Sequence, residues 1–155
     1  MNVDFHVVNA LVPVADAFDT LKYTDIIDAG MGEGVLFILQ MGATAGDSAP
    51  IILMNASSTI TATAETAVPF VYRACVGTDV WGDWTAVAAT GVTLDTTTAN
   101  SMWQFYVDSA EVAETGYRYL RMSIDEVNNL AQTAGILGLV INPRYAMTMP
   151  GSVLD

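Results

Sequence analysis

The residues that could most readily take part in catalysis or metal binding are carboxylates, because the 155-residue chain has seventeen acidic and five basic side chains. Such acids could serve as the acid and base of a glycoside hydrolase, or as calcium ligands. With this many acids close pairs arise by chance, and no segment has the alternating Asp/Asn loop and downstream Glu of a calcium site. We therefore expect solvated turn acids, with no metal bound. The close pairs are Asp25/Asp28, Asp79/Asp83 and Asp125/Glu126.

Nucleophilic chemistry would depend on His6 and Cys75, because each is the single residue of its type. One histidine and one cysteine make a zinc site improbable, and a lone cysteine forms no internal disulfide. Cys75 lies in a strand-like run, where a lone cysteine is ordinarily a small core residue. The glycine-rich stretch 30–34 lacks the lysine and the following helix of a phosphate-binding loop. We expect no enzyme activity and no cofactor.

Three tryptophans offer a different possibility, the stacking of aromatic rings on sugars. Trp81 and Trp84 flank the Gly82-Asp83 turn, and Trp103 lies on a later predicted strand. Packing of the first two across their own hairpin is the favoured interpretation, and a carbohydrate-binding surface is the alternative. Three arginines on predicted strands are expected to pair with acids of neighbouring strands or subunits. They are Arg73, Arg118 and Arg121.

Composition narrows the classes of partner. The net charge of −12 opposes binding to nucleic acid and to anionic membrane surfaces, both of which require cations. Hydrophobic residues make up 52% of the chain and charged residues 14%, against roughly 25% charged in typical soluble domains. This balance indicates surface that is covered in an oligomer or a larger assembly. The N-terminus lacks the basic region of a secretory signal, so we expect synthesis in a cytoplasm.

Short apolar segments separated by turn-forming residues position these side chains. About eight strands and almost no helix indicate an all-β protein, an antiparallel sandwich or barrel. The run 35–39 is expected to be buried on both sides, and 59–66 to form a strand with one wet face. A capping box at 108–111 predicts one helical turn. The other predicted strands are 51–54, 70–76, 84–88, 92–94, 103–108, 117–124 and 136–141.

The two ends of the chain lack a clear period. We predict an N-terminal arm or edge segment at residues 1–22, a β-sandwich domain at 23–145 and a C-terminal tail at 146–155. Both terminal segments are expected to be extended, and either could lie on a neighbouring molecule.

Five segments between Lys22 and Tyr145 resemble, in order and spacing, the capsid decoration (cement, head-stabilising) proteins of tailed bacteriophages. The resemblance covers about four-fifths of the chain and concerns overall pattern, since each segment is ordinary strand-and-turn composition. The segments are Lys22-Tyr23-Thr24-Asp25-Ile26-Ile27, Pro69-Phe70-Val71-Tyr72-Arg73, Trp81-Gly82-Asp83-Trp84-Thr85, Gly116-Tyr117-Arg118-Tyr119-Leu120-Arg121 and Asn142-Pro143-Arg144-Tyr145.

The resemblance implies a jelly-roll-like β-sandwich that binds the outer surface of a phage head, as a homotrimer, and stabilises the shell. The implied partners are other copies of the chain and the major capsid protein, and the implied location is the virion. The alternative is a carbohydrate- or receptor-binding module of a phage head or fibre. The residues predicted at a subunit or capsid interface are Phe5, Val7, Val8, Leu11, Val12, Phe18, Arg144 and Tyr145.

Overall fold

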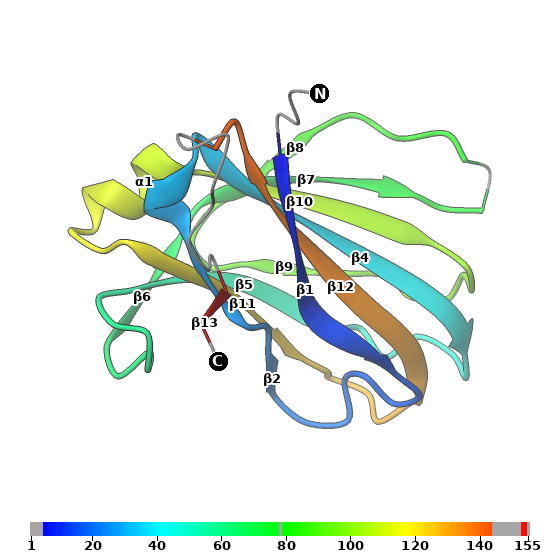
Figure 1. Ribbon diagram of the computed structural model, residues 1–155. Coiled ribbons are helices and arrows are strands. Elements are labelled where there is room, and N and C mark those ends of the chain that lie inside the picture. Colours follow the sequence, from blue (N-terminus) through cyan, green and yellow to red (C-terminus); the bar gives the residue numbers. More distant parts are fainter. Residues whose placement is uncertain (1–4, 78, 144–152, 155) are drawn as a thin grey trace.

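Two antiparallel sheets face each other in the computed structural model, which describes residues 5–77, 79–143 and 153–154 (Figure 1). Sheet A has six strands, in spatial order β1 (Phe5–Val14), β12 (Gln132–Ile141), β4 (Gly34–Thr44), β10 (Met102–Asp108), β7 (Phe70–Cys75) and β8 (Thr85–Val87). The expected all-β antiparallel sandwich is confirmed, and the structure is not a barrel.

Sheet B has seven strands. Its main order is β13 (Val153–Leu154), β3 (Ile26–Asp28), β11 (Tyr119–Asp125), β5 (Ile51–Ser57) and β6 (Glu65–Val68). The short strands β2 (Lys22–Tyr23) and β9 (Val92–Thr93) pair with β11 and β5. A 3₁₀ turn, η1 (Ala29–Met31), and one helix, α1 (Ser109–Glu114), complete the described structure. No described helix has the length and apolar character needed to cross a membrane.

The pairing is nested, as in a long hairpin that folds over on itself. Strand β1 pairs with β12, β3 with β11, β4 with β10, and β5 with β6. This double-sheet arrangement is that of a jelly roll, with β7 and β8 added beyond β10. The described residues form thirteen strands, against about eight expected, and five of the thirteen have three residues or fewer.

Alternating side chains from both sheets fill the space between them. Val35, Phe37 and Leu39 of β4 are fully buried there. Leu120, Met122 and Ile124 of β11 meet them from the other sheet, and all three share one face as predicted. Each such side chain contributes about 1.5–3 kcal/mol on burial, so this layer supplies the main folding free energy.

Two local expectations are wrong. Leu36 and Ile38 of β4 are only half-buried, so the run 35–39 is enclosed on its inner side and open on its outer side. Residues 58–64 form turns instead of the predicted strand, and β6 begins at Glu65. Threonine hydroxyls hold the turn, because Thr59 bonds those of Thr61 and Thr63 and competes with strand pairing.

The predicted helical turn is confirmed as α1. Its N-cap is Asp108, whose carboxylate accepts a hydrogen bond from the backbone N–H of Ala110 at 2.8 Å. Strand β1 lies at one edge of sheet A, next to β12. Most of the expected tail, 146–155, lies outside the described residues.

Candidate functional site

The acid pairs singled out in the sequence have different surroundings, and the expectation of solvated turn acids is wrong for Asp28. Asp28 is buried, and its carboxylate accepts two bonds from Arg118, at 2.7 and 2.6 Å, and one from Gly30 N–H at 3.0 Å. Asp79 and Asp83 are exposed. Among the described residues, no group of three His, Cys, Asp or Glu side chains could hold a metal ion.

His6 and Cys75 are far apart. His6 is half-buried on the edge strand β1, whereas Cys75 is buried at the end of β7, with three strands of sheet A between them. At a strand spacing of about 4.8 Å, four steps separate the two residues by roughly 19 Å. They cannot form a thiol–imidazole pair.

Two carboxylates each have one buried oxygen atom without a hydrogen-bond partner among the described residues. These atoms are Oε2 of Glu126 and Oδ1 of Asp16. Burial raises the pKa of the Glu126 carboxyl, and the charges of Asp16, Asp19 and Asp125 raise it further, against a hydrogen bond from the Leu130 backbone. Sequence spacing missed Asp16, because 110 residues of chain separate it from Glu126.

The outer face of sheet B carries polar groups that satisfy one another, beside half-buried apolar side chains such as Leu53 and Tyr119. Arg121 binds Glu65 at 2.5 and 2.8 Å, and its guanidinium lies 3.6 Å from the centre of the Tyr23 ring. Asn55 donates to Ser123 at 2.9 Å. The expected pairing with acids of neighbouring strands is thus confirmed for Arg118 and Arg121, and this face is suited to water.

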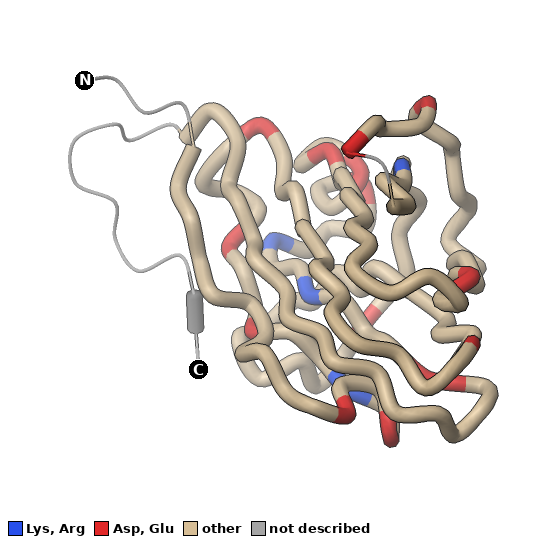
Figure 2. The backbone as a smooth tube through the Cα atoms, turned by 90° about the vertical axis from the view of Figure 1, so that its right-hand side faces the viewer, with Lys and Arg blue, Asp and Glu red and all other residues tan. Residues whose placement is uncertain are grey.

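The outer face of sheet A is more apolar. Its outward positions are predominantly apolar and are exposed or half-buried, and among the described strands only Arg73 and Asp108 are charged there. Most acidic positions lie instead at strand ends and connections (Figure 2). We call this surface the A face. Its apolar members are Phe5, Val7, Leu36, Ile38, Val71, Met102, Tyr106, Leu137, Leu139 and Ile141.

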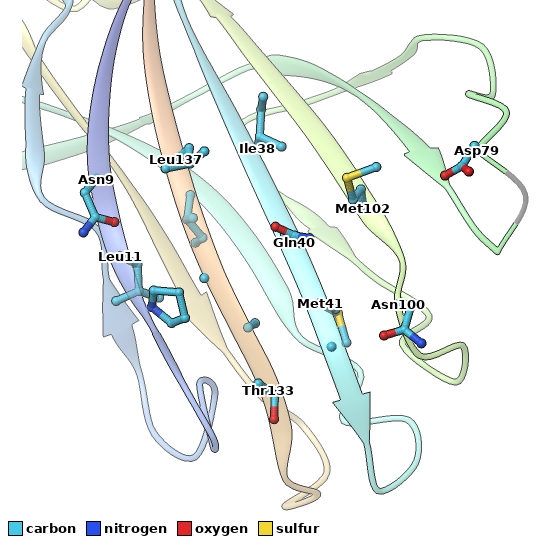
Figure 3. A pocket seen from close by; sticks show the side chains of 15 residues that line it. Asn9, Leu11, Ile38, Gln40, Met41, Asp79, Asn100, Met102, Thr133 and Leu137 are labelled. Atoms are coloured by element: carbon cyan, nitrogen blue, oxygen red, sulfur yellow. The ribbon is translucent and has the colours of Figure 1, made fainter.

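A groove of about 510 Å³ hollows the A face between β1 and β10 (Figure 3). Leu11, Ile38, Met102 and Leu137 supply its apolar lining, and Gln40 lies among them. Pro13 lies over Gly135, where an added Cβ would come within 2.7 Å of the proline ring, so the glycine lets β1 close this end of the groove. Polar side chains line it as well, and among these described residues Asp79 is the one that is charged, so the groove combines apolar contact with a single acid at its margin. The polar members are Asn9, Gln40, Asp79, Asn100 and Thr133.

Beside the groove, two tryptophans enclose Arg73. Its guanidinium lies 4.9 Å from the Trp81 ring centre and 4.5 Å from that of Trp84, and Nε donates to Gln104 Oε1 at 2.8 Å. Within the described part of the chain Arg73 has no carboxylate partner, so the predicted ion pair is not formed inside the chain. Trp103 is buried in the core and cannot serve as a stacking platform.

The predicted interface residues separate into three groups. Phe5, Val7 and Val12 are exposed, and Leu11 lines the groove. Val8 and Phe18 point into the chain's own core, because alternation along β1 turns Val8 inward and Phe18 is fully enclosed. Arg144 and Tyr145 lie outside the described residues.

No family model matches this chain, and no curated relative matches it. Among solved structures, the SPBc2 prophage-derived protein YomS aligns at 14% identity and a TM-score of 0.47, covering 89% of this chain and 93% of that one.

Two further solved structures align over most of this chain. The Yersinia pseudotuberculosis-derived mitogen is 12% identical with a TM-score of 0.32, covering 93% of this chain and 97% of its own. A structure of infectious bursal disease virus, Gx strain, is 10% identical with a TM-score of 0.28, covering 92% of this chain and 33% of the viral one. The structural neighbours thus include a prophage-derived protein and a virus protein.

Proposed function

We propose that this chain is a structural virion protein that binds the outer surface of a tailed-phage capsid as a homo-oligomer and stabilises the shell. The observation that supports it most is the A face, a broad apolar surface on a chain with a net charge of −12. Soluble monomers rarely expose contiguous apolar patches of this kind, and such patches mark protein contacts. The phage context derives from the sequence resemblance described above.

The proposed mechanism is thermodynamic linkage. A protein that binds the assembled shell and not its separated subunits stabilises the shell by its binding free energy. Copies joined in an oligomer bind with a high effective concentration, so weak single contacts give strong attachment. This role uses no bound cofactor and no catalytic group.

Particle binding is the direct test. Purified protein is mixed with heads of the phage whose genome encodes it, after removal of any native copies, and the heads are sedimented and then heated. We expect the protein to co-sediment and the heads to release DNA at a higher temperature. Protein that remains in the supernatant, together with an unchanged release temperature, would contradict the proposal.

A carbohydrate- or receptor-binding module is the second candidate, and Trp84 is the observation that favours it. This ring is 45% exposed beside Arg73 and Trp81, which together offer an aromatic surface and a cation. A glycan array read by direct binding tests this candidate, with Trp84→Ala as the variant. Binding that disappears in the variant supports this candidate, and an array on which the wild-type protein binds no glycan rules it out for the glycans tested.

A further inference from the structure

The groove on the A face suits an occupant that is largely apolar and carries no negative charge. Its lining from Leu11, Ile38, Met102 and Leu137 offers apolar contact, and Leu137 is 45% exposed on the central part of the sheet. Leaving such surface in water forfeits about 25 cal/mol for each Å² that could be covered. An acidic segment would lose its hydration here and would gain no ion pair, because the one charged residue among the described lining residues is Asp79.

The chain itself carries a complementary feature. Phe5 and Val7 open β1, are 45% and 50% exposed, and do not line the groove. Their strand pairs with β12 on one side and, within the described residues, with no strand on its other side. The start of β1 therefore presents an apolar ridge at the edge of the sandwich. We call Phe5 and Val7 the β1 ridge.

Charge favours contact between copies at these two features over contact elsewhere. Each copy has seventeen acids and a net charge of −12, so most approaches between two copies are repulsive. The outward positions of sheet A carry one positive and one negative side chain, Arg73 and Asp108, so this face adds almost nothing to the repulsion. Asp79 lines the groove, but the β1 ridge is uncharged, so a second copy can place the ridge there with little opposing charge.

We propose that the groove of one copy receives the β1 ridge of a second copy. This inference deepens the proposed function and rests on its oligomeric part, since it assigns the contact that joins the copies. The same ridge and groove on every chain allow repeated contacts that close into a symmetric oligomer, such as the trimer that the resemblance implies. Capsid binding then uses surface outside this contact.

Paired substitutions test the contact. Leu137→Asp places a charge in the groove, Val7→Asp places one on the ridge, and Ile60→Asp is the control at a similar exposure of 46%, away from sheet A. We expect sedimentation velocity to show an oligomer for the wild type. The first two variants should raise the dissociation constant of the oligomer at least tenfold, and the control should leave it unchanged. Thermal unfolding of each variant confirms that the monomer is folded.

Cross-linking between separate variants tests the proximity directly. Val7→Cys chains are mixed with Leu137→Cys chains under oxidising conditions, and any link between them joins two copies. We expect the mixed link to form, and mixtures of Ile60→Cys with Leu137→Cys to form none. Because Cys75 is buried in β7, it contributes little background.

The outcomes separate this contact from the proposed function. An oligomer that survives both aspartate substitutions and forms no mixed link overturns the ridge-and-groove contact, while co-sedimentation with heads still supports the virion role. A wild-type chain that stays monomeric at micromolar concentration overturns the contact and the oligomeric part of the proposed function together.

Discussion

At the scale of single residues, the charged side chains divide between those that build the fold and those left for other uses. Arg118 and Arg121 hold carboxylates of neighbouring segments in two-bond contacts, and Asp28 is buried under one of them. Arg73 instead lies between two indole rings. These three arginines are therefore not equivalent, although all three lie in predicted strands.

Arg118→Ala should destabilise the fold by about 1–3 kcal/mol, because it removes two donors from a carboxylate that is 10% exposed. Lys22→Ala is the control, since its contact with Asp19 joins two partly exposed side chains three residues apart. Exposed pairs of this kind contribute about 0.5 kcal/mol or less. Urea unfolding at pH 7 measures both changes, and equal losses would contradict the structural role given to Asp28.

Glu126→Gln should raise the melting temperature at pH 7 and leave it nearly unchanged at pH 4. The pKa of the folded carboxyl is raised, first by burial and then by Asp16 and other acids, so its charged form disfavours folding. Stability from this group is therefore greatest below its unfolded pKa and falls as the pH rises through the folded pKa. Melting curves of wild type and variant between pH 4 and 7 should diverge.

The matching control for this titration is Asp83→Asn, which removes an exposed acid from a turn. Its melting curves should run parallel to those of wild type over the same pH range. A constant difference between wild type and Glu126→Gln at every pH would show that packing, and not the carboxyl charge, determines the effect.

At the scale of elements, small residues decide how closely the strands and sheets approach. Gly138 lies in the middle of β12, opposite Val8 of β1 and Phe37 of β4. A Cβ there would come within 2.5 Å of Ile27 Cδ1 and 2.7 Å of Val8 Cγ2. Ile27 belongs to sheet B, so this glycine helps set the distance between the two layers.

Gly138→Ala should therefore cost about 1–3 kcal/mol through overpacking. Gly42→Ala is the matched control, because Gly42 also lies in a strand of sheet A and its added Cβ would meet its nearest neighbour, a Thr133 methyl, at 3.5 Å. We expect the control to change stability by about 0.5 kcal/mol or less. The midpoints of urea unfolding measure the two effects, provided that the dependence of the unfolding free energy on urea is the same for both variants. Similar midpoints would refute the packing argument.

At the scale of the whole molecule, the two outer faces differ in how many polar contacts they contain. Sheet B presents ion pairs and hydrogen bonds that its own residues complete. Sheet A presents apolar side chains and a groove. Acids at the strand ends surround both faces, so the chain combines a high negative charge with one region suited to contact.

Association between copies should strengthen as salt rises from about 0.05 to 0.5 M. Repulsion between chains of net charge −12 is screened as the Debye length falls from roughly 14 Å towards 4 Å. The favourable free energy of an apolar contact changes little over the same range of salt. Sedimentation equilibrium across this series measures the association constant. A contact dominated by ion pairs would show the reverse trend, with association weakening as salt is added.

The sequence by itself determined the fold class, because apolar alternation and turn residues act over a few neighbouring positions. It predicted β4, β10, β11 and the hairpin β7–β8. It also predicted that Arg118 and Arg121 pair with acids, without identifying which acids. It failed at residues 58–64, where threonine-rich composition suits both strands and hydroxyl-bonded turns.

Only the tertiary structure decided which apolar residues face water. Val7 and Val8 are neighbours of the same type, yet Val7 is exposed and Val8 is buried. Leu36, Ile38 and Leu137 resemble core residues in the sequence, but the nested pairing of β1, β12, β4 and β10 gathers them on the A face. A local pattern fixes which residues alternate along a strand, whereas the second sheet covers one side of sheet A and leaves the other open.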